Sequence, residues 1–199
     1  MDAHRPPRLV AVDMDGTFLR SNHTYDRERF GRLFAAMRAA GCRFVVASGN
    51  QYYQLRSFFT DLPFDEVAYV AHNGAYVRVG DEVVSVAKLP ESDARHVIDS
   101  LPADSSIAFL AAGPEGAYVP DTMSDWLYDR MATYHHRQQR VPSLDAVTDK
   151  VFAFGIERAD GVTDEQAADL TARVGGVVRA VTSGHSSIDL LMPGCHKAN

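Results

Sequence analysis

Residues 9–17 read LVAVDMDGT and contain the pattern that decides the fold. The run Leu9–Val12 is short, continuous and apolar, which is typical of a strand buried on both faces of a sheet. The run leads into Asp13 and Asp15, and Gly16 then permits a sharp turn. Open α/β sheets place their active sites at the carboxyl ends of such strands. The stretch therefore predicts an α/β fold with a candidate site directly after its first strand.

Strands and helices alternate after this stretch. Asp26 is a suitable cap for a helix that runs to about Ala40. Phe44–Ala47 and Val67–Ala71 are two further candidate buried strands, with a helix near Tyr52–Phe59 between them. This strand–helix–strand order predicts βαβ units and a Rossmann-like parallel sheet.

The alternation loosens from about residue 83, which indicates a second domain. We expect residues 1–82 to form the first part of the parallel core, residues 83–185 an inserted α+β cap, and residues 186–199 a return to the core. From residue 83 onward we expect helices near 92–101, 121–135 and 163–174, and strands near 107–111, 151–156, 177–182 and 188–192. Trp126 is expected in the core of the insert. Asp189 alternates with Ile188 and Leu190 and is expected to face water.

Composition and charge exclude several classes of protein. The 199 residues are 46% hydrophobic and 23% charged, which are ordinary globular values. A net charge of −6 argues against nucleic acid or an anionic membrane as a partner. The two cysteines, Cys42 and Cys195, have no metal-ligand spacing. With no apolar leader or membrane-length run, we expect a soluble protein of the reducing cytoplasm.

Asp13 and Asp15 are the first candidate functional residues. Side chains at i and i+2 share one face of a strand, so both carboxylates can serve one site. Burying unpaired charge is costly, and a bound Mg²⁺, which prefers oxygen ligands, would offset their repulsion. The alternative is a strand-end turn with a solvated aspartate, and for an isolated Asp-x-Asp that alternative would prevail.

Three further positions change this balance. Ser48-Gly49-Asn50 follows the second buried strand, where a hydroxyl and a backbone amide can cradle a phosphate group. Alone, this loop is equally an ordinary helix cap, and Lys197 alone would be read as a surface lysine. Together with the aspartates, these residues supply what phosphoryl transfer needs: a nucleophile, an acid/base, a hydrogen-bond donor to the phosphate and a positive charge that holds it.

At this point the sequence resembles the haloacid dehalogenase superfamily. Asp13–Thr17 is similar to motif I (DxDGT) of that superfamily, Ser48 to its motif II hydroxyl and Lys197 to its motif III lysine. The insertion between Ser48 and Lys197 resembles the cap of the Cof-type subgroup. Four stretches resemble broad-specificity bacterial sugar phosphatases of that subgroup: residues 12–19 (VDMDGTFL), 44–53 (FVVASGNQYY), 73–75 (NGA) and 193–199 (PGCHKAN).

The resemblance implies a Mg²⁺-dependent phosphatase that hydrolyses small sugar phosphates through an aspartyl-phosphate. Asp13 would attack phosphorus, and Asp15 would protonate the leaving alcohol and then accept a proton from water. Mg²⁺ would bind Asp13 and Asp15, the latter through its backbone carbonyl. The phosphoryl oxygens would be held by a set of four residues: Ser48, Gly49, Asn50 and Lys197.

One departure from the family's pattern concerns motif IV, a GDxxND-type loop that supplies further metal carboxylates. It should follow Lys197, but the sequence stops at Asn199. We therefore expect a partial version of a longer protein, with poor or no activity in the 199-residue form. Leu9–Val12 would then be an exposed sheet edge through which chains could self-associate. Two alternatives stay open: a phosphomutase of the same superfamily, and an inactive module that binds phosphate or metal.

Overall fold

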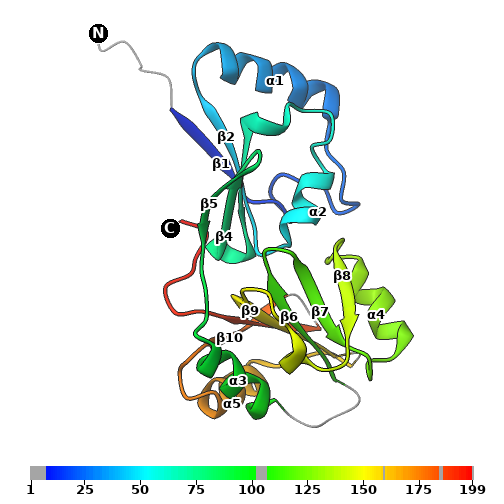
Figure 1. The fold of residues 1–199 in the computed structure, drawn as a ribbon. Coiled ribbons are helices and arrows are strands. Elements are labelled where there is room, and N and C mark those ends of the chain that lie inside the picture. Colours follow the sequence, from blue (N-terminus) through cyan, green and yellow to red (C-terminus); the bar gives the residue numbers. More distant parts are fainter. Residues whose placement is uncertain (1–7, 102–106, 159, 184–185, 199) are drawn as a thin grey trace. The chain divides into compact units, whose positions relative to one another are not determined.

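The computed structural model describes residues 8–101, 107–158, 160–183 and 186–198. Two compact units divide the chain. The first extends to Ser85 and also includes Lys197, and the second extends from Val86 to His196. Figure 1 shows the elements of both units in chain order.

The first unit is built on a five-stranded sheet with the order β1-β2-β3-β4-β5. The first three strands are parallel, and β4 is antiparallel to β3. The elements of this unit are β1 (Leu9–Val12), α1 (Arg27–Ala39), β2 (Arg43–Ala47), α2 (Tyr52–Ser57), η1 (Phe64–Glu66), β3 (Val67–Ala71), η2 (His72–Gly74), β4 (Tyr76–Val79) and β5 (Glu82–Val86). The expected strand–helix–strand order and the fold class are confirmed.

Helix α1 forms where the sequence predicts it and packs on β2, while α2 packs on β3. The carboxylate of Asp26 accepts a hydrogen bond from the Arg29 N–H and so caps α1. Phe30 and Phe34 form its buried face, and the Phe30 ring centroid lies 4.9 Å from those of both Phe18 and Phe44. These rings cover one face of the sheet with the apolar surface that stabilises it.

Strand β1 lies at the end of the sheet order, with β2 as its neighbour among the described strands. Leu9 is 54% exposed, whereas the four residues Phe44–Ala47 of β2 are all buried. The edge position expected for Leu9–Val12 is therefore present in the sheet.

The second unit contains a six-stranded sheet with the order β10-β11-β9-β6-β7-β8. Its elements are α3 (Glu91–Ser100), β6 (Ile107–Gly113), β7 (Gly116–Pro120), α4 (Asp125–Ala132), β8 (Gln138–Val141), η3 (Leu144–Ala146), β9 (Ala153–Arg158), α5 (Asp164–Arg173), β10 (Arg179–Ser183) and β11 (Ser187–Leu191). Val97 of α3 and Leu170 of α5 belong to one hydrophobic cluster with Phe154 of β9. These two helices therefore share one core with the sheet.

Several details differ from the sequence-based expectations. The boundary expected near residue 83 lies at Val86, and the one expected near 186 lies at Lys197, because β11 pairs with β9 in the second sheet. Trp126 was expected in the core but is 56% exposed. Asp189 was expected to face water but is partly buried, on the sheet face that also carries Glu157.

Candidate active site

The carboxyl ends of the three parallel strands place the candidate residues at one edge of the first sheet. Asp13 directly follows β1, Ser48 follows β2 and His72 follows β3. The register pairs Val12 with Val46 and Ala47 with Val70, so the strands end at the same level. Parallel pairing therefore brings together residues that are far apart in sequence.

Asp13 is held between two donors from opposite ends of the chain. Its Oδ1 accepts a hydrogen bond of 2.5 Å from the Lys197 ammonium group, and its Oδ2 accepts one of 3.2 Å from the Thr17 hydroxyl. The Asp13 and Lys197 side chains are 38% and 43% exposed, so a small ligand in solution can reach both. A charge-assisted contact of this kind fixes the carboxylate's orientation.

Asp15 lies in the turn that Gly16 completes at a φ of 72°. The Asp15 Oδ2 atom accepts a hydrogen bond of 2.9 Å from the Asn50 side-chain amide. The other carboxylate oxygen of Asp15, Oδ1, lies 4.0 Å from Nδ1 of His23. Asp15 is therefore oriented by the loop after β2, which is the loop expected to bind phosphate.

Ser48 is 2% exposed, and its hydroxyl oxygen accepts a 3.1 Å hydrogen bond from the Asn50 backbone N–H. This contact closes a local turn between residues 48 and 50 and does not cap α2, which begins at Tyr52 with Gln51 as its N-cap residue. The alternative of an ordinary helix cap at this loop is therefore wrong. Gly49, between Ser48 and Asn50, has little room for a side chain, because a Cβ there would lie 3.0 Å from the Asn73 side-chain nitrogen. The structure thus brings all six sequence-predicted site residues to one edge of the first unit.

The donor set at this edge is suited to a hard cation. Asp13 offers a carboxylate oxygen and Asp15 a backbone carbonyl oxygen, and Mg²⁺ prefers oxygen ligands and commonly keeps several waters beside one or two carboxylates. Among the residues that the structure describes, no group of three or more His, Cys, Asp or Glu side chains could hold a metal. The Asp13 carboxylate and the Asp15 backbone carbonyl would fit a magnesium ion that keeps several waters, and the Asp15 carboxyl group would stay available for proton transfer.

Sequence reasoning missed three contacts at this site. The Thr17 hydroxyl donates a hydrogen bond to Asp13, a role that the motif alone does not assign to Thr17. His23 has a positive φ of 55°, which carries its ring toward Asp15, and a sequence gives little sign of this. The turn His72–Gly74 donates two backbone hydrogen bonds to the loop after β2, and this contact was not predicted from the sequence.

Comparison with known proteins identifies the family. The family described as haloacid dehalogenase-like hydrolase matches residues 10–199. The chain belongs to this family. The resemblance drawn from the motifs, including the Cof-type subgroup, is confirmed. An Escherichia coli (strain K12) relative named 5-amino-6-(5-phospho-D-ribitylamino)uracil phosphatase YbjI is 39% identical over 192 residues, which cover 96% of this chain and 70% of the relative.

Solved structures of the haloacid dehalogenase fold superpose on the chain. SMU.1108c from Streptococcus mutans UA159 is 25% identical to this chain, with a TM-score of 0.83. The superposition covers 96% of this chain and 73% of SMU.1108c. BT4131, named as a subclass IIB sugar phosphatase, has a TM-score of 0.72 at 15% identity, with 96% and 72% covered. The prediction of a phosphoric monoester hydrolase is confirmed by the family and by the phosphatase relative.

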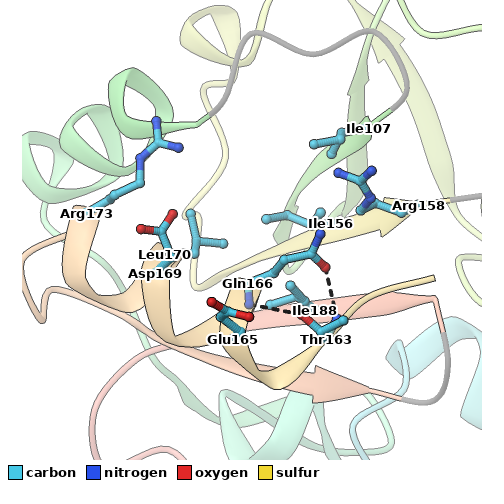
Figure 2. A pocket seen from close by; sticks show the side chains of 10 residues that line it. All are labelled: Ile107, Ile156, Arg158, Thr163, Glu165, Gln166, Asp169, Leu170, Arg173 and Ile188. Carbon is cyan, nitrogen blue, oxygen red and sulfur yellow. Dashed lines mark hydrogen bonds between the residues drawn. The ribbon is translucent and has the colours of Figure 1, made fainter. Parts of the chain in front are cut away.

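A pocket of about 420 Å³ lies in the second unit, between α5 and the sheet. Figure 2 shows its apolar floor, which includes Ile156 and Ile188, and a charged rim that includes Arg158, Asp169 and Arg173. Thr163 and Gln166, which also line the pocket, form the capping box of α5 that is drawn with dashed lines. None of the candidate site residues lines this pocket.

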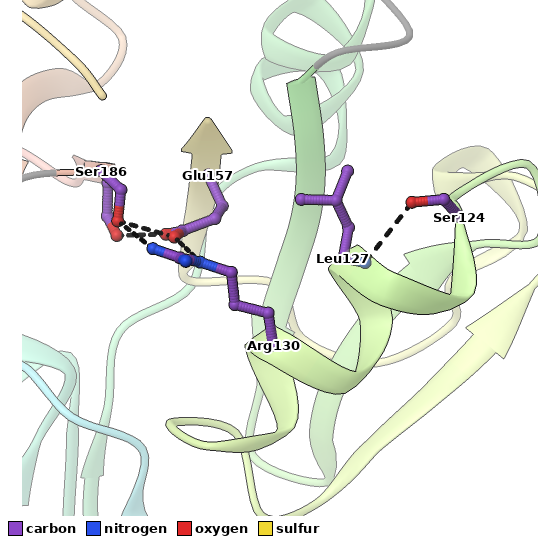
Figure 3. A network of polar contacts seen from close by, with 6 residues as sticks. Ser124, Leu127, Arg130, Glu157 and Ser186 are labelled. Atoms are coloured by element: carbon purple, nitrogen blue, oxygen red, sulfur yellow. Dashed lines mark hydrogen bonds and ion pairs between the residues drawn. The ribbon is translucent and has the colours of Figure 1, made fainter. Parts of the chain in front are cut away.

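A network of polar contacts links α4 to the sheet of the second unit (Figure 3). Glu157 Oε1 accepts hydrogen bonds of 2.7 Å from both Arg130 and Ser186, and Oε2 accepts one from Ser187. The Glu157 side chain is only 10% exposed, so these donors compensate a carboxylate that is removed from water. The network is satisfied internally and holds α4 in place.

In the part of the chain that the structure covers, every helix is too short or too polar to cross a bilayer.

Proposed function

We propose that the chain hydrolyses phosphomonoesters of small sugars, with Asp13 as the nucleophile. The observation that carries the proposal is the contact between Lys197 Nζ and Asp13 Oδ1. A lysine beside the nucleophile offers positive charge where a phosphoryl group arrives, and a phosphoester dianion would otherwise be repelled by the carboxylate. Asp13 is also accessible to solvent, as a nucleophile must be.

In the first step, an Asp13 carboxylate oxygen attacks phosphorus, and the bond between phosphorus and the ester oxygen breaks. The leaving alkoxide takes a proton from Asp15, and Asp13 is left as an aspartyl-phosphate. In the second step, Asp15 accepts a proton from a water molecule while the oxygen of that water attacks phosphorus. The bond between phosphorus and Asp13 then breaks, which releases inorganic phosphate and restores the carboxylate.

Asn50 supports proton transfer by Asp15, because its side-chain amide donates a 2.9 Å hydrogen bond to Asp15 Oδ2 and so orients the carboxyl group. Thr17 similarly restrains Asp13 Oδ2, and lone pairs on the carboxylate oxygens that accept no hydrogen bond stay free to attack. The Ser48 hydroxyl and the Gly49 amide, with Lys197, would hold the phosphoryl oxygens. Mg²⁺ bound by Asp13 and Asp15 would neutralise negative charge that develops on the transferred group.

The proposed substrate class is a phosphate ester on a polyhydroxylated carbon chain. The name of the Escherichia coli relative adds a second candidate, a phosphoribityl compound, since that relative is 39% identical over 96% of this chain. Both candidates present a primary phosphate ester on carbons that carry hydroxyl groups. Substrate selection would lie mainly in the second unit, which we propose to be a cap.

The test is release of inorganic phosphate from two groups of compounds, in excess Mg²⁺ and in excess chelator. One group contains glucose 6-phosphate and other sugar monophosphates, and the other contains a phosphorylated ribitylamino-pyrimidine. We expect phosphate release that disappears with chelator and returns with Mg²⁺. Release at full rate in chelator would contradict the metal site, and absence of release from every compound would contradict the proposed reaction.

We also propose a location and a mode of association. Cys42 and Cys195 are both free thiols, which suits the reducing cytoplasm. With a net charge of −6, the partner would be a small phosphorylated molecule and neither nucleic acid nor membrane. Strand β1 would pair with a second copy, and Leu9→Lys should weaken concentration-dependent self-association in sedimentation experiments, because an edge lysine opposes strand pairing. Unchanged association in that variant would contradict this mode.

A further inference from the structure

The turn after β3 is unusual in its backbone conformation. His72, Asn73 and Gly74 have φ values of 48°, 53° and 89°, three left-handed residues in succession. Only glycine adopts this region freely, and a non-glycine residue there is uncommon. Two consecutive non-glycine residues therefore require contacts that compensate for the conformation.

The compensating contacts are made with the loop after β2. The His72 N–H donates to the Asn50 carbonyl at 3.1 Å, and the Asn73 N–H donates to the Ser48 carbonyl at 3.0 Å. The turn thus binds the carbonyl groups on either side of Gly49. In this conformation successive N–H groups point the same way, whereas in an extended backbone they point to opposite sides, so an extended backbone at His72 and Asn73 could not make both bonds.

The Asn73 side chain adds a third contact. A Cβ placed on Gly49 would lie 3.0 Å from Asn73 Nδ2 and 3.4 Å from Asn73 Oδ1, so the Asn73 amide lies directly against the Gly49 backbone. Asparagine is among the few non-glycine residues that tolerate a positive φ, and its flat amide fits against a residue without a side chain. Gly49 and Asn73 are therefore matched to each other.

We propose that Asn73 is a positioning residue that holds the Ser48–Asn50 loop in the conformation required for phosphate binding. The loop in turn places the Asn50 amide on Asp15, so the effect of Asn73 reaches the proposed acid/base. This inference rests on the proposed function, since it assigns Asn73 a part in the same site. Asn73 itself does not act on the reacting atoms.

The first experiment compares Asn73→Val with Asn73→Gly. Valine strongly disfavours a positive φ, whereas glycine adopts it freely and keeps the N–H that binds Ser48. We expect Asn73→Val to lower kcat/KM at least about tenfold and to weaken inorganic phosphate binding by a similar factor. Asn73→Gly should stay within about threefold of the parent in both measurements. Thermal melting of each variant identifies the folded fraction, to which the rates are referred.

The second experiment tests the match between Gly49 and Asn73 and does not depend on valine being tolerated. Gly49→Ala should weaken phosphate binding about tenfold in the parent, because its Cβ meets the Asn73 amide. In the Asn73→Gly background the same change should cost less than about threefold, since the amide is gone.

Equal losses from Gly49→Ala in both backgrounds would overturn the inference, as would wild-type phosphate binding in folded Asn73→Val. Phosphate binding is measured by calorimetry with Mg²⁺ present, so the result does not depend on turnover. If the parent binds phosphate with the expected coupling but releases none from any ester, the proposed reaction fails and the role of Asn73 stands. If the parent turns over and the coupling is absent, the role of Asn73 fails alone.

Discussion

The ammonium nitrogen of Lys197 lies 2.5 Å from Oδ1 of Asp13, although 184 positions separate the two residues in sequence. Between them the chain leaves the first unit at Val86, forms the second unit and returns at Lys197. The fold therefore completes the site only after the whole second unit has been inserted. A lysine that is unremarkable in the sequence becomes the neighbour of the proposed nucleophile.

Lys197→Ala should lower kcat/KM by roughly 10²-fold, the loss typical of removing one group that stabilises transition-state charge. Lys197→Arg keeps the charge and should recover part of the loss. The matched control is Lys88→Ala, which removes an exposed lysine from the second unit. Steady-state kinetics with a sugar monophosphate measure all three. Equal rates for Lys197→Ala and Lys88→Ala would contradict the role of Lys197.

The sequence predicted the first unit well because its signals are local. Apolar runs mark β1, β2 and β3, and Asp26 is found as the cap of α1. The burial expected on both faces of Leu9–Val12 is not found, because β1 lies at the end of the sheet order and none of its residues is fully buried. Strands β4 and β5 were not predicted. The site followed from the rule that parallel strands end at one edge, which needs no knowledge of side-chain contacts.

The second unit was harder to predict because its strands depend on distant partners. β7 and β8 were missed, and the helix expected over 121–135 is shorter. It begins after Ser124, whose hydroxyl accepts from the Leu127 N–H, because Gly116–Pro120 is paired into the sheet. The sequence does not show whether the sheet face that carries a polar strand residue such as Asp189 is exposed to water or covered by other parts of the chain.

Glu157→Ala should lower the free energy of unfolding by roughly 2–3 kcal/mol, because the hydrogen bonds from Arg130, Ser186 and Ser187 to a charged group are all lost. Arg95→Ala serves as the control. It removes a pair with Asp145 in which both side chains are about half exposed, and should cost about 0.5 kcal/mol. Urea unfolding measures both changes. Equal losses of unfolding free energy in the two variants would show that the Glu157 network stabilises the fold no more than an exposed ion pair does.

Asp189 predicts a pH dependence of stability in the second unit. Burial raises the pKa of Asp189 from 3.8 to about 6, and a hydrogen bond from Ser183 opposes this while Glu157 adds to it. The folded chain then holds a proton that the unfolded chain has lost, so stability falls as pH rises from 3.8 to about 6. The loss is about 3 kcal/mol at most, since each pKa unit corresponds to about 1.4 kcal/mol.

Asp189→Asn should remove this contribution. The difference in unfolding free energy between Asp189→Asn and the parent should therefore shift in favour of the variant between pH 4 and pH 7, by about 1–3 kcal/mol. Urea unfolding at the two pH values gives the difference, in which other titrating groups cancel. A difference that is independent of pH would contradict the raised pKa.

The most direct test of the account asks whether Asp13 carries the phosphoryl group. In Asp15→Asn the second step lacks its base, so an aspartyl-phosphate should accumulate when a sugar monophosphate and Mg²⁺ are supplied. The measurement is rapid acid quenching followed by peptide mass spectrometry. We predict one added phosphoryl group on the peptide that contains Asp13, and none when Asp13→Asn is combined with Asp15→Asn. A phosphoryl group on another residue, or phosphate release by Asp13→Asn at the parent rate, would contradict the account.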